Sequence, residues 1–340
     1  MGVTISDVAQ RAGVSPATVS KYLNRKKVSA KSYARIEEAI RELNYQVNDF
    51  ARGLRTNTSQ MVGLLVPSID YTYATSLFKV VQERLTENGY GSVLYNYKNS
   101  ADAFVEKLAL VRQRMVDGVI ILISGETNDV FRQGLQELQA AKIPFVLVNG
   151  RVKGIEADTV LADNAQAIYT CIAHLLENGH RKIGLVMAQR NSYNARERVA
   201  GYHKVYAEWG LEAEEELIFC FESRKAWLIE AKEKLVGFLQ AHPELTALVM
   251  PSFRMTIVAM QAIHHVGRKI GKDIALIGFD CDIVNGAFDP ELTYIQLPSE
   301  EIAATAIELL IDAIGRKEER APREICIPVY KVDGDSVFRI

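Results

Sequence analysis

The sequence predicts an N-terminal all-α headpiece containing a helix-turn-helix, followed by an α/β core of two similar lobes. Residues 1–47 show apolar side chains at helical spacing between capping signals. From Met61 onward, short apolar strands alternate with amphipathic helices in two series of about four units, which indicates parallel sheets covered on both faces. The charge divides at the same place: residues 1–60 carry a net charge of +5, and the rest of the 340-residue chain carries −7.

The composition excludes several classes of protein. With 48% hydrophobic and 24% charged residues, the chain resembles an ordinary globular protein with a sizeable core. No apolar run approaches the ~18–20 residues of a membrane span and no signal-peptide pattern precedes the first helix, so a cytoplasmic location is expected. The cysteines lie far apart inside apolar runs, which favours reduced thiols, and neither a metal nor a cofactor is expected; they are Cys171, Cys220, Cys281 and Cys326.

The first two predicted helices are short and are joined by a tight turn. Ile5, Val8 and Ala12 follow helical spacing, and Thr4 with Asp7 forms a capping-box pattern at the start. Gly13 supplies the turn. Ser15 caps the second helix, whose first residue is Pro16, a position at which the missing N–H costs nothing. The outer face of this second helix carries Pro16, Ala17, Ser20 and Lys21.

A third helix completes the headpiece. It begins after Ser29 and carries the apolar residues Tyr33, Ile36, Ile40 and Leu43. Two helices joined by a glycine-containing turn and closed by a third form a helix-turn-helix, whose second helix fits the DNA major groove. A generic three-helix bundle is the alternative, but the basic charge of this region favours nucleic-acid binding.

The run "VTISDVAQRAGVSPATVSKYLN" resembles the DNA-binding headpiece of the lactose-repressor (LacI/GalR) family of bacterial transcription regulators. The resemblance implies that Pro16, Ala17 and Lys21 read bases. Where many members have arginine, Lys21 offers a point charge in place of a bidentate grip on guanine. The resemblance further implies that four polar residues contact phosphates or cap helices, namely Thr4, Ser15, Thr18 and Asn24. Ser20, on the outer face of the second helix, is a further DNA-binding candidate.

Residues 48–59 are predicted to form a hinge helix and linker. Isolated, the segment is too short for a stable helix, and Gly53 weakens it by roughly 1 kcal/mol relative to alanine. A flexible tether is one interpretation. The family resemblance favours the other, a hinge helix that folds on the DNA minor groove with Leu54 as an apolar wedge. The DNA-binding candidates of this segment are Asn48, Ala51, Arg52, Leu54 and Arg55.

The core is predicted from strand–helix alternation over residues 60–340. The first strands are "MVGLLVPS", "YGSVLYNY", "DGVIILIS" and "PFVLVNG"; the second series is "KIGLVMA", "ELIFCFE", "ALVMPS" and "DIALIGFD". A helix over 300–314 and a strand "EICIPVY" end the chain. The expected first lobe spans about 60–161 plus 292–322, and the second lobe about 162–291 plus 323–340. This pattern resembles the type I periplasmic-binding-protein fold of the family's effector-binding core.

Ligands of open α/β sheets bind beyond the carboxyl ends of the strands, so the residues there are candidates for an effector site. The family resemblance implies that Arg196, in "NARERVAGY", and Asp280, in "IGFD", bind the effector; a guanidinium and a carboxylate can together hold vicinal hydroxyls. A helix-start ion pair and a turn cap are the structural alternatives for these two residues. The remaining effector-binding candidates are Asp70, Tyr71, Tyr73, Asn149, Arg151, Tyr193, Ser252 and Phe253.

The resemblance has one departure that bears on the ligand. Many members have Asn-Asp where this chain has Ser252-Phe253, so a familiar set of sugar contacts is lost and an aromatic face is gained. The effector is therefore expected to be a sugar, an unusual or phosphorylated sugar, a nucleobase, or absent. The tyrosines and Phe253 are equally plausible as packing residues.

Together these observations predict a transcriptional repressor that binds a near-palindromic DNA operator as a homodimer and responds to a small-molecule effector in the interlobe cleft. A first alternative is a DNA-binding regulator whose core answers to a protein co-regulator. A second is a sugar- or nucleotide-handling enzyme with a regulatory head. No phosphate-binding glycine loop, nucleophile elbow or metal-spaced His/Cys cluster supports the second, so no enzymatic activity is expected.

Overall fold

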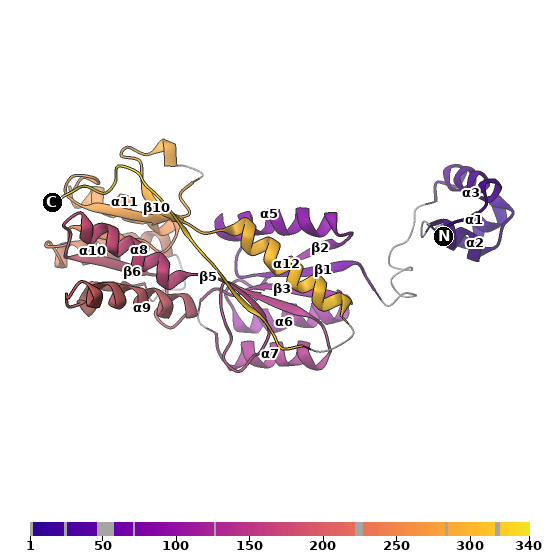
Figure 1. Ribbon diagram of the computed structural model, residues 1–340, viewed down its shortest axis with the longest axis horizontal. Helices are drawn as coiled ribbons and strands as arrows, with labels where there is room; N and C mark the ends of the chain where they lie inside the picture. The colour runs from indigo at the N-terminus through magenta and orange to yellow at the C-terminus, as the bar shows by residue number, and fades with distance from the viewer. Residues whose placement is uncertain are drawn as a thin grey trace. The chain divides into compact units, whose positions relative to one another are not determined.

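A computed structural model of the 340-residue chain describes residues 3–23, 26–45, 58–70, 72–125, 127–221, 227–282, 285–316 and 320–340. The chain forms two compact units, Met1–Ser59 and Gln60–Ile340. The first unit is helical and the second is α/β (Figure 1). Both the helix-turn-helix headpiece and the two-lobed parallel core that the sequence predicts are confirmed. The predicted hinge helix lies outside the described residues.

The headpiece consists of helices α1 (Ile5–Ala12), α2 (Pro16–Leu23) and α3 (Ala30–Glu42). The capping box forms: the Thr4 hydroxyl accepts from the Asp7 amide at 3.3 Å, and the Thr4 amide donates to Oδ2 of Asp7 at 2.8 Å. Gly13 ends α1 with φ +62°, a conformation that glycine adopts without a steric cost. The buried core of this unit is Val8, Ala9, Ala12, Val19, Ile36 and Ala39.

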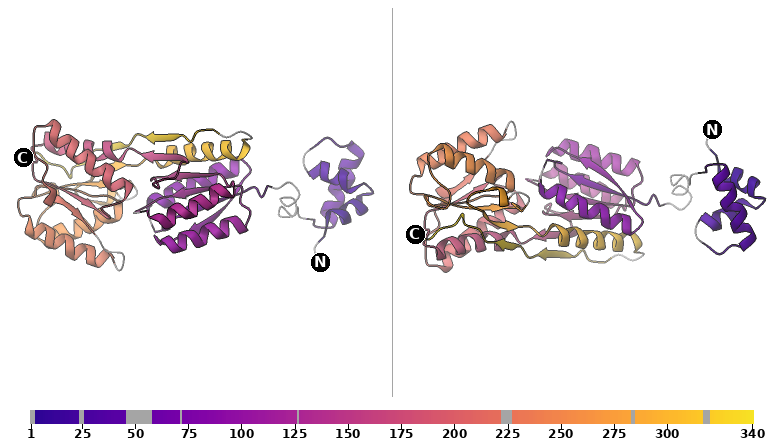
Figure 2. Two further views of the ribbon diagram at one scale, coloured as in Figure 1. Left: turned by 90° about the horizontal axis from the view of Figure 1, so that it is seen from below. Right: turned by 90° about the horizontal axis from the view of Figure 1, so that it is seen from above.

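The first lobe is built on a fully parallel six-stranded sheet with the order β11-β5-β4-β3-β1-β2. Its strands are β1 (Met61–Val66), β2 (Gly91–Asn96), β3 (Gly118–Leu122), β4 (Phe145–Val148), β5 (Asp158–Ala162) and β11 (Glu324–Ile327). Because side chains alternate along a strand, Leu64 and Leu65 enter apolar clusters on opposite faces. Helices α5 (Thr72–Glu87) and α12 (Ser299–Gly315) cover one face, and α6 (Ala101–Gln113) and α7 (Asp129–Ala140) cover the other (Figure 2).

The second lobe repeats this plan with the strand order β12-β10-β9-β8-β6-β7, in which only β12 is antiparallel. Its strands are β6 (Ile183–Met187), β7 (Ile218–Cys220), β8 (Ala247–Val249), β9 (Ala275–Phe279), β10 (Thr293–Gln296) and β12 (Tyr330–Val332). Helices α8 (Asn164–Glu177) and α9 (Tyr193–Glu208) pack together, as do α10 (Trp227–Ala241) and α11 (Phe253–His265). Two short 3₁₀ turns, Glu215–Leu217 and Asn285–Ala287, lie in loops.

The structure corrects the expected division of the last fifty residues between the lobes. Residues 292–322 were expected in the first lobe, yet β10 (Thr293–Gln296) belongs to the second sheet, and only α12 packs on the first. Residues 323–340 were expected in the second lobe, yet β11 (Glu324–Ile327) pairs with β5 of the first sheet. The predicted strand "EICIPVY" is therefore two strands in two sheets. Pro328, which has no amide N–H for a ladder, lies between them.

Candidate functional site

The outer face of α2 carries the base-reading candidates of the headpiece. Pro16, Ala17 and Lys21 are exposed, whereas Val19 on the opposite face is fully buried. Thr18 and Ser20 are half-buried at the edges of this face. Since the helix is fixed from within by Val19, its outer side chains are free to enter a groove of DNA.

Two of the polar candidates act as helix caps in this structure. Thr4 closes the capping box of α1. The Ser15 hydroxyl accepts from the Thr18 amide at 3.2 Å and lies 2.9 Å from the Thr18 hydroxyl. Both residues therefore hold helix N-termini in place, which is the helix-capping role that the sequence offers for them. The candidates Asn24, Asn48, Ala51, Arg52, Leu54 and Arg55 lie outside the described residues.

A basic hollow lies at the C-terminal end of α2, and the sequence analysis does not predict it. It has a volume of about 600 Å³ and is lined by Tyr22, Leu23, Lys26, Lys27, Val28 and Tyr33, with no acidic residue among them. The Lys26 amide donates to the carbonyl of Lys21 at 2.9 Å, which places the two lysines next to the end of α2. The rings of Tyr22 and Tyr33 meet edge-on with centroids 4.9 Å apart. The run "RKK" is its only sequence signal, and a charge run alone does not indicate a binding site.

In the core, Asp280 lies where β9 ends. Its backbone is left-handed, with φ +53°, and its side chain is only 8% exposed. Oδ1 accepts from the Leu297 amide at 2.9 Å, and the Asp280 amide donates to Ile295 at 2.9 Å, so β10 holds this residue in position. Burial raises the pKa of the Asp280 carboxyl to about 7, against the lowering effects of the Leu297 hydrogen bond and the charge of Arg198.

Arg198 supplies the cation of this site. Its Nε donates to Oδ1 of Asn164 at 2.7 Å, and one terminal nitrogen donates to the carbonyl of Pro251 at 3.0 Å. Its guanidinium carbon lies 4.6 Å from the centroid of the Phe279 ring. Phe279 is the residue directly before Asp280 in the chain. Burial lowers the pKa of Arg198 to about 10, and attraction to Asp280 opposes that shift. The group remains a cation at neutral pH.

Close packing of α8 against α9 positions Arg198 and its partner Asn164. A β-carbon at Gly201 would collide with the carbonyl oxygen of Ala165, so the two helices can approach this closely only because residue 201 is glycine. Asn164 begins α8, and Arg198 lies one turn before Gly201 on α9. The hydrogen bond between their side chains therefore depends on this helix contact.

Tyr73 brings the first lobe to the same place. It lies in α5, and its hydroxyl is buried without a hydrogen-bond partner. Burial raises the pKa of the Tyr73 phenol, and the charge of Asp280 in the second lobe raises it further, so the phenol lies within electrostatic range of that carboxyl. An unpaired buried hydroxyl is costly in free energy, and a bound polar ligand would satisfy it.

Arg196 does not join this group. Its side chain is exposed, and a terminal nitrogen donates to the carbonyl of Asn191 at 2.6 Å. Residues two apart on an α-helix point in nearly opposite directions, and Arg198 shares its spacing with the buried residues Ala195, Tyr202 and Val205. Helical periodicity within "ARERVAGY" could have identified Arg198 as the inward arginine.

The other effector candidates lie in separate surroundings. Ser252 caps α11 by accepting from the Met255 amide at 3.4 Å, and Phe253 packs against the apolar cluster of the second lobe. Asp70 is exposed, and its Oδ2 accepts a hydrogen bond from the Ser68 hydroxyl at 3.1 Å. Asn149 is half-buried with φ +63° and donates its amide to Val160. Arg151 and Tyr193 contact each other, and Tyr71 lies outside the described residues.

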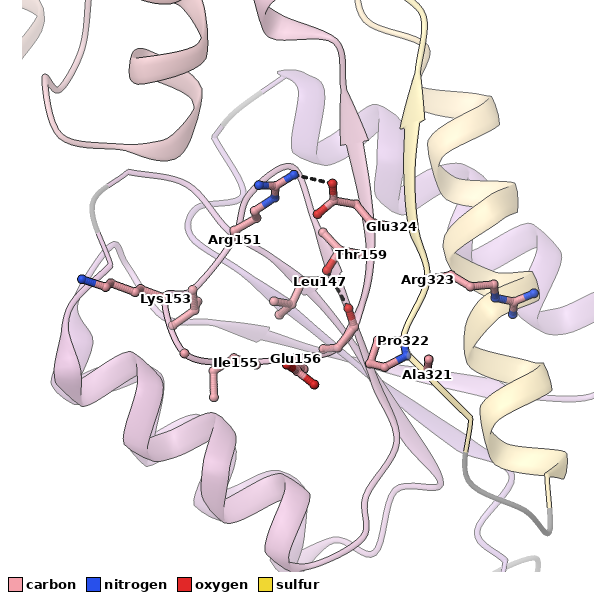
Figure 3. Close-up of a pocket in the computed structure, with 13 residues that line it drawn as sticks. Leu147, Arg151, Lys153, Ile155, Glu156, Thr159, Ala321, Pro322, Arg323 and Glu324 are labelled. Carbon is pink, nitrogen blue, oxygen red and sulfur yellow. Dashed lines mark hydrogen bonds and ion pairs between the residues drawn. The ribbon is translucent and has the colours of Figure 1, made fainter.

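A second hollow, whose lining does not include Asp280, lies along β11 (Figure 3). It has a volume of about 540 Å³, and the loop 151–157 and the chain leading into β11 form its walls. Arg151 and Glu324 form an ion pair on its rim, and Arg323 points away toward α12, where it binds Asp312 at 2.8 Å. Two of its cations, Arg151 and Arg323, are thus held in ion pairs, and Lys153 and Glu156 also belong to its lining.

Among the residues that the structure describes, no group of three or more histidine, cysteine or acidic side chains could hold a metal ion. None of the helices in the described part of the chain is long and apolar enough to cross a membrane.

A helix-turn-helix headpiece joined to a two-lobed α/β core defines a DNA-binding transcription regulator. Residues 4–48 match the family model "Bacterial regulatory proteins, lacI family", and residues 59–333 match "Periplasmic binding proteins and sugar binding domain of LacI family". The chain belongs to the LacI family of bacterial regulatory proteins and is a DNA-binding transcriptional repressor of that type.

Individual relatives agree with this assignment. The chain is 30% identical to the HTH-type transcriptional repressor PurR of Proteus mirabilis over 323 residues, which cover 94% of this chain and 92% of that protein. It is 29% identical to the PurR of Aliivibrio salmonicida, over 92% and 93% of the two chains. Among solved structures, the lac repressor dimer bound to operator and an anti-inducer matches with a TM-score of 0.85 at 23% identity, over 99% of this chain and 100% of that one. The structural match supports the fold alone.

Proposed function

We propose that this repressor acts in the cytoplasm as a homodimer, that each headpiece binds one half of a near-palindromic operator, and that a small polar effector binds between the lobes. Pro16, Ala17 and Lys21 on the outer face of α2 would read bases. Ser15, Thr18 and Ser20 border that face, and Lys26 and Lys27 would contact phosphates. Two-fold symmetry of a dimer matches the symmetry of a palindromic site.

The observation that carries the effector proposal is the group formed by Tyr73, Arg198 and Asp280. It combines a buried carboxyl, a guanidinium and an unpaired hydroxyl from both lobes at the carboxyl ends of the strands. Arg198 takes the role that the sequence assigned to Arg196. Solved relatives include a cellobiose complex of CelR at 24% identity and a D-xylulofuranose complex at 21% identity, which supports a sugar or sugar derivative as the ligand class.

The same group supports binding without catalysis. In this site Arg198 is already engaged by Asn164 and Pro251, and Asp280 by Leu297, so both side chains are held for recognition. The family assignment is to regulators. We therefore propose that the effector leaves the protein unchanged, which a turnover assay with the bound ligand would test.

A thermal-shift screen of the full-length protein tests the effector site. A ligand at one hundred times its dissociation constant should add about 2.7 kcal/mol to the free energy of unfolding, a rise of several degrees in Tm. The panel contains sugars, sugar phosphates, nucleosides and nucleobases. Arg198→Met and Asp280→Asn should abolish the shift, and the matched control Arg196→Met should retain it. A thermal shift that survives Arg198→Met but is lost in Arg196→Met would show instead that Arg196 binds the effector, as the family resemblance implies.

A screen without any hit would count against a small-molecule effector and favour the protein co-regulator. The DNA half of the proposal has its own test, which is selection of duplexes from a random library by the wild-type protein. Enrichment of a near-palindromic sequence is the expected result. Enrichment of a single asymmetric half-site would contradict the dimer.

A further inference from the structure

Arg151 connects the two lobes of the core. It lies in the loop that follows β4 in the first lobe, whereas Tyr193 begins α9 in the second lobe. The guanidinium carbon of Arg151 lies 5.0 Å from the centroid of the Tyr193 ring. This distance is within the range of a cation–π interaction, so the contact spans the lobe boundary.

The first lobe anchors Arg151 through an ion pair. One terminal nitrogen of its guanidinium binds Oε1 of Glu324, which begins β11 at the edge of the first sheet (Figure 3). A planar guanidinium can donate hydrogen bonds in its plane while an aromatic ring lies against its face. Arg151 is therefore held in one lobe and presented to the other.

The second lobe offers Arg151 two groups from one face of α9. Tyr193 and Glu197 are four residues apart, which places them on neighbouring turns of the helix. Burial lowers the pKa of Arg151, but the hydrogen bond with Glu324 and the charges of the Tyr193 phenolate, Glu324 and Glu197 together raise it above its ordinary value. Acidic groups of both lobes therefore attract the same cation. Burial, and then the charge of Glu197, raises the pKa of the Tyr193 phenol to about 12, so the ring is neutral at physiological pH.

We propose that Arg151, Tyr193, Glu197 and Glu324 form an interlobe clasp that stabilises the lobe arrangement of this structure. Arg151 and Glu324 belong to the same lobe and stay together when the lobes move, whereas the cation–π contact with Tyr193 and the electrostatic attraction to Glu197 are lost. A contact that exists in only one arrangement shifts the equilibrium between arrangements by its own free energy. The role differs from the effector contacts that the sequence predicts for Arg151 and Tyr193.

The clasp bears on regulation, and this step rests on the proposed function. If operator affinity depends on the lobe arrangement, loss of the clasp changes the affinity of the ligand-free protein for DNA. Half of the Arg151 side chain is exposed, so the cation–π contact is only partly desolvated. At such a site its loss corresponds to about a two- to fivefold change in an equilibrium constant.

The test uses the full-length protein and an operator that the wild-type protein selects from random duplexes. Arg151→Met, Tyr193→Leu and the double variant remove the clasp. Tyr193→Phe keeps the ring, and Lys153→Met removes a neighbouring charge from the same loop. The measurements are the operator Kd without ligand, amide hydrogen exchange across residues 188–195, and Tm as a check on folding.

We expect Arg151→Met and Tyr193→Leu each to change the operator Kd about two- to fivefold in the same direction. The double variant should change the Kd no more than the single variant with the larger effect, because both substitutions remove the same contact. Both controls should have the Kd of the wild type. Amides of residues 188–195 should exchange faster in the clasp variants. Additive effects on the Kd, or wild-type exchange in well-folded clasp variants, would overturn the clasp. A wild-type protein that selects no duplex would refute the proposed function instead, and the exchange measurement would still decide the clasp.

Discussion

At the scale of single residues, Asp280 shows how the fold changes the chemistry of an ordinary side chain. The carboxyl is buried at the end of β9, where one hydrogen bond from Leu297 and the charge of Arg198 only partly offset the loss of hydration. Its pKa of about 7 makes it half-ionised near neutral pH. A ligand that donates hydrogen bonds to Asp280 would favour the ionised form.

The raised pKa has a consequence for stability. As pH rises, the unfolded chain loses this proton near the ordinary aspartate pKa of 3.8, whereas the folded chain loses it only near 7. The free energy of unfolding therefore falls across that window. The asparagine of Asp280→Asn does not titrate, so only the wild type loses stability as pH rises. We therefore expect the free energy of unfolding of Asp280→Asn minus that of the wild type to be about 2 kcal/mol larger at pH 8 than at pH 5. Urea unfolding of both proteins at the two pH values measures this.

Asp102→Asn, at an exposed acid in the first turn of α6, is the matched control and should show no comparable change with pH. A constant difference between Asp280→Asn and the wild type at both pH values would show that the carboxyl is ionised normally in the folded state.

At the scale of elements, we expect α2 and the loop that follows it to take different parts in DNA recognition. The exposed face of α2 offers small and apolar contacts from Pro16 and Ala17 beside the charge of Lys21. The hollow behind it offers two exposed lysines and two tyrosines. Phosphate contacts position a protein on the duplex, and base contacts decide the sequence.

The lysines of this hollow should therefore control salt dependence. For Lys26→Ala plus Lys27→Ala we expect the slope of log K against log salt concentration to become shallower by about 2, since each phosphate contact contributes about 0.9. Affinity should fall almost equally for the operator and for random duplexes. Titrations at several salt concentrations measure both quantities.

Lys272→Ala, an exposed lysine of the second lobe, serves as the control for loss of charge. If the double lysine variant weakened only the operator complex and left the slope unchanged, the hollow would read bases and not phosphates.

At the scale of the whole molecule, the two lobes are joined by three crossings of the chain, after β5, after β10 and after β11. The effector group and the interlobe clasp both lie at the boundary that these crossings define. A ligand that binds one lobe arrangement better than the other shifts the equilibrium only by that difference in affinity. Under the proposed function, regulation therefore originates at the lobe boundary.

Residues 48–59, the predicted hinge segment, connect the headpiece to the core in the sequence. The sequence predicts Leu54 as a minor-groove wedge, and we expect Leu54→Ala to weaken operator binding at least about tenfold while nonspecific binding changes little. Competition titrations with an operator duplex and a random duplex of equal length measure the two affinities. An equal loss on both duplexes would contradict the wedge.

The sequence by itself determined the helix-turn-helix, the alternation of strands and helices, and the family. Each of these is encoded within about twenty consecutive residues, as in the capping box of Thr4 and Asp7 or the buried strand Met61–Val66. The effector role of Asp280 came from the family resemblance of "IGFD" and stays a prediction. Local patterns suffice because caps, turns and periodicities act between near neighbours in the chain.

Only the tertiary structure decided which lobe holds β10 and β11, which arginine accompanies Asp280, and that Arg151 meets Tyr193. These facts depend on contacts between segments far apart in the sequence, such as Glu324 with Arg151 or Asn164 with Arg198. Strand pairing and side-chain burial are set by the whole packed core, in which a residue's neighbours come from many elements at once. Local patterns do not contain that information, apart from the helical periodicity of "ARERVAGY", which favours Arg198 as the inward arginine.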